Sequence, residues 1–298
     1  MLSILIPIYN QDVRKLVLTL AKQCNKLEIN YQILCFDDGS TEKYRSLNQQ
    51  LAHTIHVNYT ELNENLGRSR IRNWLGKAAY FEYLLFLDGD SKVVSKNFIK
   101  TYIENLHPEK VIQGGRIYSK AKPRSKKKML HWKYGRNRES LTARKRNKHP
   151  ALNFHSNNFI IPAKVFSQHP FDTTVQGYGY EDTLYAQKLQ YAGVDIVHID
   201  NPTIHMGIEL NHVFLAKTKQ ATENLAKLYA SSKLKDTRLI KWYEFLNSYE
   251  LWPSFEWYYR YRQKKIEENL NGDDPSIVNF NLWKLYMFGE NLKEKQSK

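Results

Sequence analysis

The first hundred residues alternate between short apolar runs and segments with helical periodicity. Continuous apolar runs cover residues 2–8, 33–36 and 83–87, and a weaker run covers residues 56–59. An apolar run without polar alternation is typical of a strand that is covered on both faces. The pattern therefore predicts four buried strands in this part of the chain.

The segments between these runs have apolar residues at helical spacing. Residues 13–24 and 66–79 each place apolar side chains along one stripe, and Ser95 is expected to cap a further helix that runs to Leu106. Alternation of strands and helices indicates an α/β fold with a mostly parallel, doubly wound sheet.

Three of the predicted strands end on polar residues. The first strand ends in Tyr9-Asn10, the second in Asp37-Asp38-Gly39-Ser40 and the fourth in Asp88-Gly89-Asp90. Ligands of open parallel sheets bind at the carboxyl ends of the strands. We therefore expect these three strand ends to meet along one edge of the sheet.

The chain changes character after residue 115. Residues 116–150 are densely basic and are expected to form a flexible loop or an exposed helix, whereas the α/β pattern returns at residues 157–161 and 194–199. The pattern after Asn211 is helical. We expect the aromatic residues of this tail to pack its helices on the domain. The side chains concerned are Trp242, Trp252, Trp257 and Tyr258.

Composition limits the class of protein. The chain has 298 residues, of which 42% are hydrophobic, which suits one large α/β domain or one domain with an appendage. The net charge of +15 favours acidic partners such as nucleotide phosphates, anionic lipid headgroups or nucleic acid. Cys24 and Cys35 fit no metal-binding spacing and suit a reducing cytosol, although two cysteines do not exclude a disulfide.

The sequence shows no secretory signal, because the apolar N-terminal run is short and lacks a preceding basic region. No stretch approaches the roughly 18 apolar residues of a membrane span. We therefore expect a cytoplasmic protein that is soluble, or at most peripheral at the cytoplasmic membrane face.

Asp88 and Asp90 form an acid pair around Gly89, directly after an apolar strand. Two carboxylates this close repel each other, and burial strengthens the repulsion. A Mg²⁺ or Mn²⁺ ion would offset it, because hard cations take carboxylate oxygens and keep positions open for substrate phosphates. Gly89 would let the backbone approach a ligand closely. A solvated surface turn is the alternative interpretation.

The second acidic strand end has a structural and a functional interpretation. Ser40 or Thr41 is expected to cap the following helix. Asp37 and Asp38 could in addition accept hydrogen bonds from a base imide or a ribose hydroxyl.

Arg68 and Arg72 lie one turn apart near the start of a predicted helix. The arginine side chains and the N-terminus of the helix could together receive a diphosphate. A solvated basic face is the alternative.

Glu181 and Asp182 end the loop GYGYED and open a predicted helix that runs to Ala192. The two acids either complement the helix dipole or supply a general base at the mouth of the site. His205 follows an apolar strand, and it becomes a candidate metal ligand only if a metal site lies nearby.

Together these residues resemble the family 2 glycosyltransferases with the GT-A fold. The match lies in the order and spacing of SILIPIYN, CFDDGST, ENLGRSRIRN, LLFLDGD and GYGYEDTL, followed by a downstream histidine. It covers roughly residues 1–210. The resemblance implies a nucleotide-sugar donor, a divalent cation (Mn²⁺ or Mg²⁺) and inversion at the anomeric carbon.

The resemblance also implies a role for each matching residue. Asp90 would bind the metal with His205, and Asp88 would face the ribose or the metal. Asp182, with Glu181 beside it, would deprotonate the acceptor hydroxyl. The residues expected to bind the donor, with Asp38 at the base, are Pro7, Tyr9, Asp37, Asp38, Arg68, Arg72 and Asp88.

The resemblance leaves the substrates open. The loop before Glu181 reads Gly-Tyr-Gly-Tyr where many relatives have Gly-Trp or Gly-Gly, and this loop usually shapes the sugar pockets. A UDP-sugar is the expected donor. A glycan or lipid-linked acceptor is expected, in surface polysaccharide or glycolipid synthesis.

The predicted domain organisation follows the extent of the resemblance. A catalytic domain covers residues 1–210, with a nucleotide-sugar half at 1–115 and an acceptor half at 116–210 that contains the basic insertion 120–150. A helical extension covers residues 211–298.

The basic insertion has two interpretations. Its lysines Lys126, Lys127 and Lys128, with nearby aromatic residues, either face anionic lipids or form a solvated loop. Three other functions fit parts of the sequence: a nucleic-acid- or membrane-binding protein without transferase activity, a nucleotidyltransferase or sugar-nucleotide pyrophosphorylase, and an inactive transferase-like binding protein. Nucleic acid is the less expected partner because the basic residues cluster away from the acidic strand ends. The strand end PIYNQD lacks the Gly-rich loop of nucleotidyltransferases.

Overall fold

The computed structural model describes residues 1–175 and 177–296, which form two compact units. The first unit contains residues 1–118, 139–175 and 181–207, and the second contains the remaining described residues. Residues 119–138 of the basic segment thus group with the C-terminal helices. The division into a donor half and an acceptor half stays a prediction.

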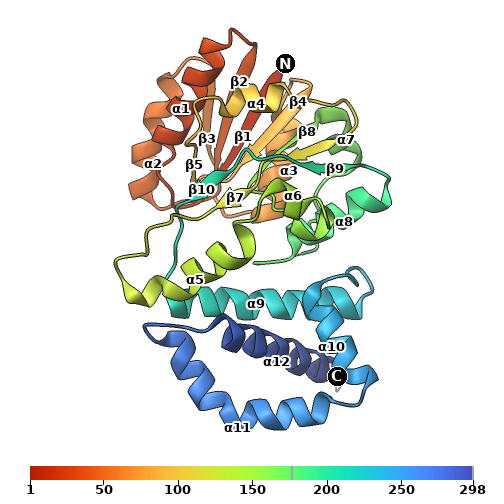
Figure 1. The fold of residues 1–298 in the computed structure, drawn as a ribbon. Coiled ribbons are helices and arrows are strands. Elements are labelled where there is room, and N and C mark those ends of the chain that lie inside the picture. Colours follow the sequence, from red (N-terminus) through yellow and green to blue (C-terminus); the bar gives the residue numbers. More distant parts are fainter. Residues whose placement is uncertain (176, 297–298) are drawn as a thin grey trace. The chain divides into compact units, whose positions relative to one another are not determined.

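A seven-stranded sheet forms the centre of the first unit (Figure 1). Its strands are β1 (Leu2–Ile8), β2 (Tyr31–Asp37), β3 (Val57–Glu61), β4 (Tyr83–Leu87), β6 (Val111–Gln113), β8 (Asn158–Pro162) and β9 (Ile196–His198). They lie in the order β3-β2-β1-β4-β8-β6-β9, and only β8 among them runs antiparallel to its neighbours. The four predicted strands and the mostly parallel sheet are confirmed, but β3 is an edge strand and none of its residues is buried.

Helices cover both faces of this sheet, as a doubly wound fold requires. Apolar side chains of α1 (Arg14–Lys26) and α4 (Phe98–Ile103) pack on one face. Those of α3 (Arg68–Ala78), α7 (Ala163–Gln168) and α8 (Glu181–Tyr191) pack on the other. Helices α2 (Glu42–Asn48) and α6 (Ala143–Arg146) also belong to this unit.

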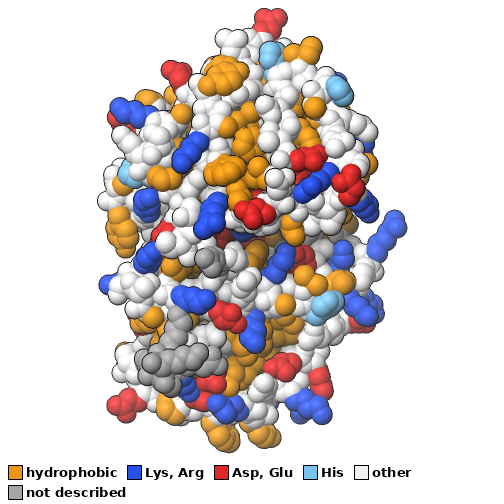
Figure 2. Space-filling model, turned by 180° about the vertical axis from the view of Figure 1, so that it is seen from behind, with side chains coloured by type: hydrophobic (Ala, Val, Ile, Leu, Met, Phe, Trp, Pro, Cys, Tyr) orange, Lys and Arg blue, Asp and Glu red, His pale blue; other side chains and the backbone are white. Residues whose placement is uncertain are grey.

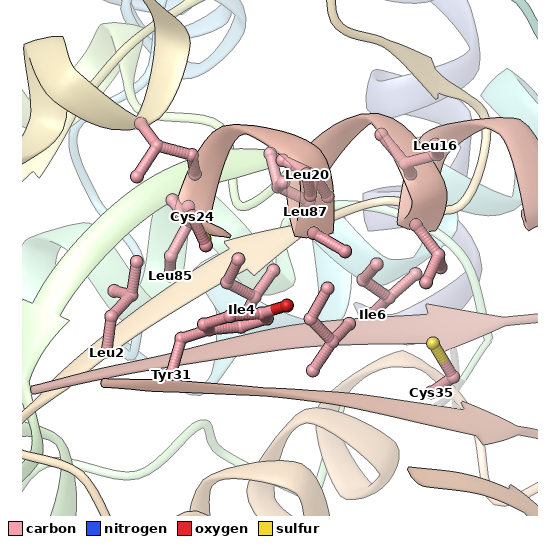
Figure 3. Packing of buried hydrophobic residues seen from close by; sticks show 14 of the residues in the cluster. Leu2, Ile4, Ile6, Leu16, Leu20, Cys24, Tyr31, Cys35, Leu85 and Leu87 are labelled. Carbon is pink, nitrogen blue, oxygen red and sulfur yellow. The ribbon is translucent and has the colours of Figure 1, made fainter. Parts of the chain in front are cut away.

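The packing of β1 on both of its faces explains why its sequence has no alternation of polar and apolar residues. Ile4 and Ile6 point into the cluster formed with α1, where Leu16 and Leu20 meet them (Figure 3). Leu5 points to the opposite face and joins the second cluster. Each fully buried aliphatic side chain of this kind contributes about 1.5–3 kcal/mol to stability. Both faces of the strand therefore need apolar residues.

Of two predicted helix caps, Ser95 is wrong and Thr41 is correct in position only. Helix α4 begins at Phe98 after Asn97, and Ser95 instead accepts a hydrogen bond from the Asn97 amide. Helix α2 begins after Thr41, whose side chain makes no capping hydrogen bond. Ser40 Oγ accepts from the Asn10 amide instead, so this hydroxyl links two strand ends.

Part of the basic segment is a buried structural element, contrary to the predicted loop or exposed helix. Arg146 is only 2% exposed. Its guanidinium donates to His198 Nδ1 at 3.1 Å, to the Ile199 carbonyl at 2.7 Å and to the Gly114 carbonyl at 3.1 Å. The five donors of an arginine can satisfy several acceptors at once. Arg146 therefore ties the basic segment to the β6 and β9 ends of the sheet.

The second unit is helical, as predicted for the chain after Asn211. Its helices are α5 (Met129–Tyr134), α9 (Asn211–Ala230), α10 (Arg238–Ser248), α11 (Trp252–Asn271) and α12 (Ile277–Gln296). An aromatic cluster that includes Phe214, Tyr259 and Phe280 forms its core. Among the described residues, no helix combines the length and the apolar character needed to cross a membrane.

The prediction that the tail aromatics pack internally is correct only for Trp252. This side chain is 6% exposed, whereas Trp242 is 60%, Trp257 71% and Tyr258 43% exposed. Helical periodicity alone does not reveal which face of a helix is covered, because aromatic residues occur on both faces of α11.

Charged side chains do not form a continuous basic track on the face shown in Figure 2, where acidic and apolar side chains lie between the lysines and arginines. Lys126 pairs with Asp273 at 3.1 Å and Lys133 pairs with Asp274 at 2.5 Å, so part of the basic segment is neutralised locally.

Both cysteines, Cys24 and Cys35, are buried and form no disulfide.

Candidate active site

The polar ends of β1 and β2 meet as the sequence predicts. Ile8 pairs with Asp37 across the two strands, and the Asp38 amide donates to the Ile8 carbonyl at 2.7 Å. The Asn10 amide donates to Ser40 Oγ at 2.7 Å, and the Ser40 amide donates to Asp37 Oδ1 at 2.7 Å. These bonds build a rigid edge at the carboxyl end of the sheet.

The carboxylate of Asp38 holds the loop that leads into α3. It accepts hydrogen bonds from the Leu66 amide at 2.7 Å and the Gly67 amide at 3.1 Å. Burial raises the pKa of Asp38, and the two amide hydrogen bonds oppose that rise. The side chains of Asp37 and Asp38 are both buried and both accept hydrogen bonds from the protein. Their contact with a nucleotide base or ribose stays a prediction.

Pro7 and Tyr9, which are also predicted to bind the nucleotide-sugar donor, lie beside this edge. Pro7 is partly buried within the strand, and Tyr9 follows the strand with 54% of its surface exposed. The Tyr9 ring is therefore accessible to a ligand at this edge.

The acid pair lies on a tight turn after β4. The Ser91 amide donates to the Asp88 carbonyl at 3.0 Å. A side chain at Gly89 would lie 3.1 Å from Val13 Cγ1 and 3.3 Å from the Pro7 carbonyl. Close packing against β1 and the residues after it therefore accounts for the glycine, and a close approach of a ligand at Gly89 stays a prediction.

Arginines of α3 offset the charge of Asp88. Arg72 Nη2 lies 2.5 Å from Asp88 Oδ1, and the Arg72 side chain is only 3% exposed. Arg68 Nη2 lies 3.8 Å from Asp88 Oδ2, and its Nε forms an ion pair with Glu181. Arg68 thus connects the acid turn to the start of α8. The alternative of a solvated basic face is wrong for Arg72, which is buried against Asp88, and the predicted binding of a diphosphate by the two arginines stays a prediction.

A small second sheet brings His205 to Asp90. It consists of β5 (Ser91–Lys92), β10 (Thr203–His205) and β7 (Arg116–Ile117), and its register pairs His205 with Ser91. His205 Nδ1 lies 3.2 Å from Asp90 Oδ2. Burial alone would raise the pKa of Asp90, but the hydrogen bond and charge of His205, with nearby arginines, hold that pKa below its usual value.

The Asp90–His205 pair suits a divalent cation by its chemistry. Carboxylate oxygen and imidazole nitrogen are both ligands of first-row metals, and Mg²⁺ or Mn²⁺ sites with few protein ligands use substrate phosphates and water. A side chain at Gly207 would lie 2.6 Å from Asp90 Oδ2, so the glycine keeps that oxygen uncovered. Within residues 1–175 and 177–296, no three His, Cys, Asp or Glu side chains gather as a metal-binding group.

Glu181 and Asp182 have contrasting environments at the start of α8. Burial raises the pKa of Glu181, against the pull of its ion pair with Arg68. Burial would also raise the pKa of Asp182, but Arg68 and His155 lower it, and the Ser156 amide donates to its Oδ2 at 3.2 Å. Asp182 is therefore ionised at neutral pH, as a general base must be.

Sequence reasoning missed the segment that supports these acids. The Asn157 carbonyl accepts from the Asp88 amide at 3.0 Å, and Ser156 orients Asp182. The sequence feature that could have revealed this segment is the run of polar residues directly before β8, which contrasts with the apolar strand itself.

Comparison with known proteins agrees with this geometry. Residues 3–169 match the family described as Glycosyl transferase family 2. This chain belongs to glycosyltransferase family 2. A chondroitin synthase of Escherichia coli is 30% identical over 107 residues, which are 35% of this chain and 15% of that protein. The chain therefore spans only a small part of this curated relative.

Solved structures show the same fold. A mannosyltransferase of Pyrobaculum calidifontis, solved with GDP-Man and Mn²⁺, has a TM-score of 0.51 at 15% identity, over 99% of this chain and 75% of that one. S. aureus TarS 1–349 has a TM-score of 0.50 at 16% identity, over 100% and 92%. Glucosyl-3-phosphoglycerate synthase of Mycobacterium tuberculosis has a TM-score of 0.51 at 12% identity, over 80% and 81%.

These likenesses and the family match confirm the predicted GT-A fold. They do not favour the alternative of a nucleic-acid- or membrane-binding protein without transferase activity.

Proposed function

We propose that this family 2 glycosyltransferase transfers a sugar from a nucleotide-diphosphate sugar to an acceptor hydroxyl, with metal dependence and inversion of the anomeric carbon. This proposal rests mainly on the observation that Arg68 forms ion pairs with both Asp88 and Glu181. This bridge supports a single site that contains the acid turn, with Asp90 as the candidate metal ligand, and Asp182 as the candidate base.

The donor that we propose is a UDP-sugar. The structure of glucosyl-3-phosphoglycerate synthase contains UDP and Mn²⁺, and that of TarS 1–349 contains UDP-GlcNAc. A GDP-sugar, as in the mannosyltransferase structure, is the second candidate. A glycan or lipid-linked acceptor, in surface polysaccharide or glycolipid synthesis, completes the proposal.

Asp90 and His205 would hold the cation in this proposal. The cation would neutralise the charge that grows on the leaving diphosphate. Asp88, which Arg72 holds at 2.5 Å, would face the ribose. Arg72 is therefore a positioning residue and not a direct phosphate ligand.

Asp182 would remove the proton from the acceptor hydroxyl as its oxygen attacks the anomeric carbon. The Ser156 amide fixes one carboxylate oxygen of Asp182 at 3.2 Å and leaves the other for the acceptor. Attack from the face opposite the diphosphate gives one displacement without a covalent enzyme intermediate. The new glycosidic bond forms as the bond to the diphosphate breaks, and the proton goes to Asp182.

A thermal-shift screen of nucleotide sugars with and without Mn²⁺ tests this proposal. A ligand that binds only the folded state stabilises it by about 2.7 kcal/mol at a concentration of 100 times Kd. We expect a UDP-sugar to raise Tm in the presence of Mn²⁺ and to have little effect without it. A chain that no nucleotide sugar stabilises would not be the enzyme that we propose.

A further inference from the structure

Helix α11 exposes an aromatic pair on the side away from the core of its own unit. Its inward residues Tyr259 and Ile266 are 0% and 2% exposed. Trp257 and Tyr261 are 71% and 77% exposed, and they lie one helical turn apart. Their rings are nearly parallel, with centroids 6.0 Å apart and an angle of 10°. A tryptophan and a tyrosine this exposed leave a large apolar area in water.

Two lysines and one glutamate, Glu268, continue the same exposed face of α11, which leaves it a net positive charge. Lys264 and Lys265 follow Trp257 by seven and eight residues, which places them on the outward side of the helix with the aromatic pair. Both lysines are exposed, and no ion pair found among the described residues involves either. Arg260, in contrast, is neutralised by Glu256 at 2.8 Å and Glu290 at 3.3 Å.

We propose that this outward face of α11, defined by Trp257, Tyr261, Lys264 and Lys265, docks the protein on an anionic phospholipid surface. Tryptophan and tyrosine are the side chains that favour the headgroup level of a bilayer. Helices that lie in this interface combine such anchors with lysines that attract anionic lipids. The net charge of the chain, +15, is opposite in sign to that of an anionic lipid surface and therefore favours the contact.

Other partners fit this face less well. A symmetric contact with a second copy would bring the two lysine pairs toward each other, and like charges oppose that contact. A neutral glycan could stack on the aromatic pair but would make no use of the lysines. The lysines near residues 126–133, which the sequence suggested for lipid contact, include two that pair with Asp273 and Asp274.

Vesicle sedimentation tests the proposal with the full chain. We expect binding to phosphatidylcholine vesicles that contain phosphatidylglycerol, weaker binding at high salt, and little binding to phosphatidylcholine alone. Replacing both lysines, Lys264→Gln and Lys265→Gln, should lower partitioning about fivefold per lysine. The double variant Trp257→Ser and Tyr261→Ser should also lose binding, and should lose it at low salt as well.

Two controls isolate this face. Tyr191→Ser removes a tyrosine that is 80% exposed in the other unit, and Lys127→Gln removes an exposed lysine of the basic segment. Both should leave partitioning unchanged. All of these side chains are exposed, so circular dichroism should show folded variants with the Tm of the wild type.

Two results would overturn the proposal: no binding to the phosphatidylglycerol vesicles, or binding that the α11 variants leave intact. In the first case, a dimer that light scattering detects and that Trp257→Ser dissociates would show that this face joins two copies of the chain instead. Donor binding is measured separately in solution, so none of these results bears on the proposed transferase activity.

Discussion

Asp182→Asn is expected to remove most sugar transfer while leaving donor binding intact. Loss of a general base typically costs a factor of ~10² to 10⁴ in rate. Asparagine keeps the shape of the side chain and an oxygen that can accept from the Ser156 amide, so the loop should keep its structure. Nucleoside diphosphate release measures the rate, and titration with the donor measures binding.

The control for this variant is Asp195→Asn. Asp195 precedes β9, at the edge of the sheet opposite the site, and pairs with Lys110 at 3.1 Å. Its replacement should leave the rate unchanged. Turnover of Asp182→Asn close to that of the control would refute the assignment of the base.

The pH dependence of transfer offers a second test of Asp182. The pKa of Asp182 is lowered, so its carboxylate stays charged until the pH falls below the ordinary aspartate value of about 3.9. The part of the acid limb of kcat/KM that belongs to Asp182 should therefore lie below that value. Because protonation of a histidine ligand also weakens metal binding, the profile is compared with that of His205→Gln. An acid limb near pH 6 or 7 that persists in this variant would indicate a different base.

Asp90→Ala should abolish the dependence of nucleotide binding on Mn²⁺. The variant removes the carboxylate that pairs with His205 at 3.2 Å, and a single imidazole holds a hard cation poorly. Calorimetric titration with UDP, with and without Mn²⁺, measures the effect. We expect Mn²⁺ to tighten binding in the wild type and to have no effect in the variant.

Gly207→Ala probes the same position without removing a ligand. Its new methyl group would lie 2.6 Å from Asp90 Oδ2, so it should weaken Mn²⁺-dependent binding while Asp90 and His205 remain. Tight, Mn²⁺-dependent binding of UDP by Asp90→Ala would contradict the metal assignment.

The sequence predicts the sheet and its acidic edge well for a physical reason. Strands buried on both faces must be apolar throughout, so β1 and β4 stand out in the sequence, and the polar residues after them mark the strand ends. The pattern alone therefore locates the strand end at Asp88-Gly89-Asp90 correctly.

The contacts between these motifs were beyond sequence reasoning. His205 reaches Asp90 through strands of two and three residues, which are too short to show periodicity. The pattern of Arg68 and Arg72 suggests a diphosphate site or a solvated face, but not their ion pairs with Asp88 and Glu181, because a helical pattern does not show which acids of other segments lie nearby. Arg146 looked like one more charge in a basic loop, although backbone carbonyls satisfy its buried guanidinium.

The configuration of the released sugar tests the proposed single displacement most directly. Slow hydrolysis of the bound donor uses water as the acceptor, so the natural acceptor need not be known, and early proton NMR spectra show which anomer forms first. A single displacement assisted by Asp182 predicts the anomer opposite to that of the donor, with release strongly reduced in Asp182→Asn. First appearance of the donor's own anomer would contradict the mechanism.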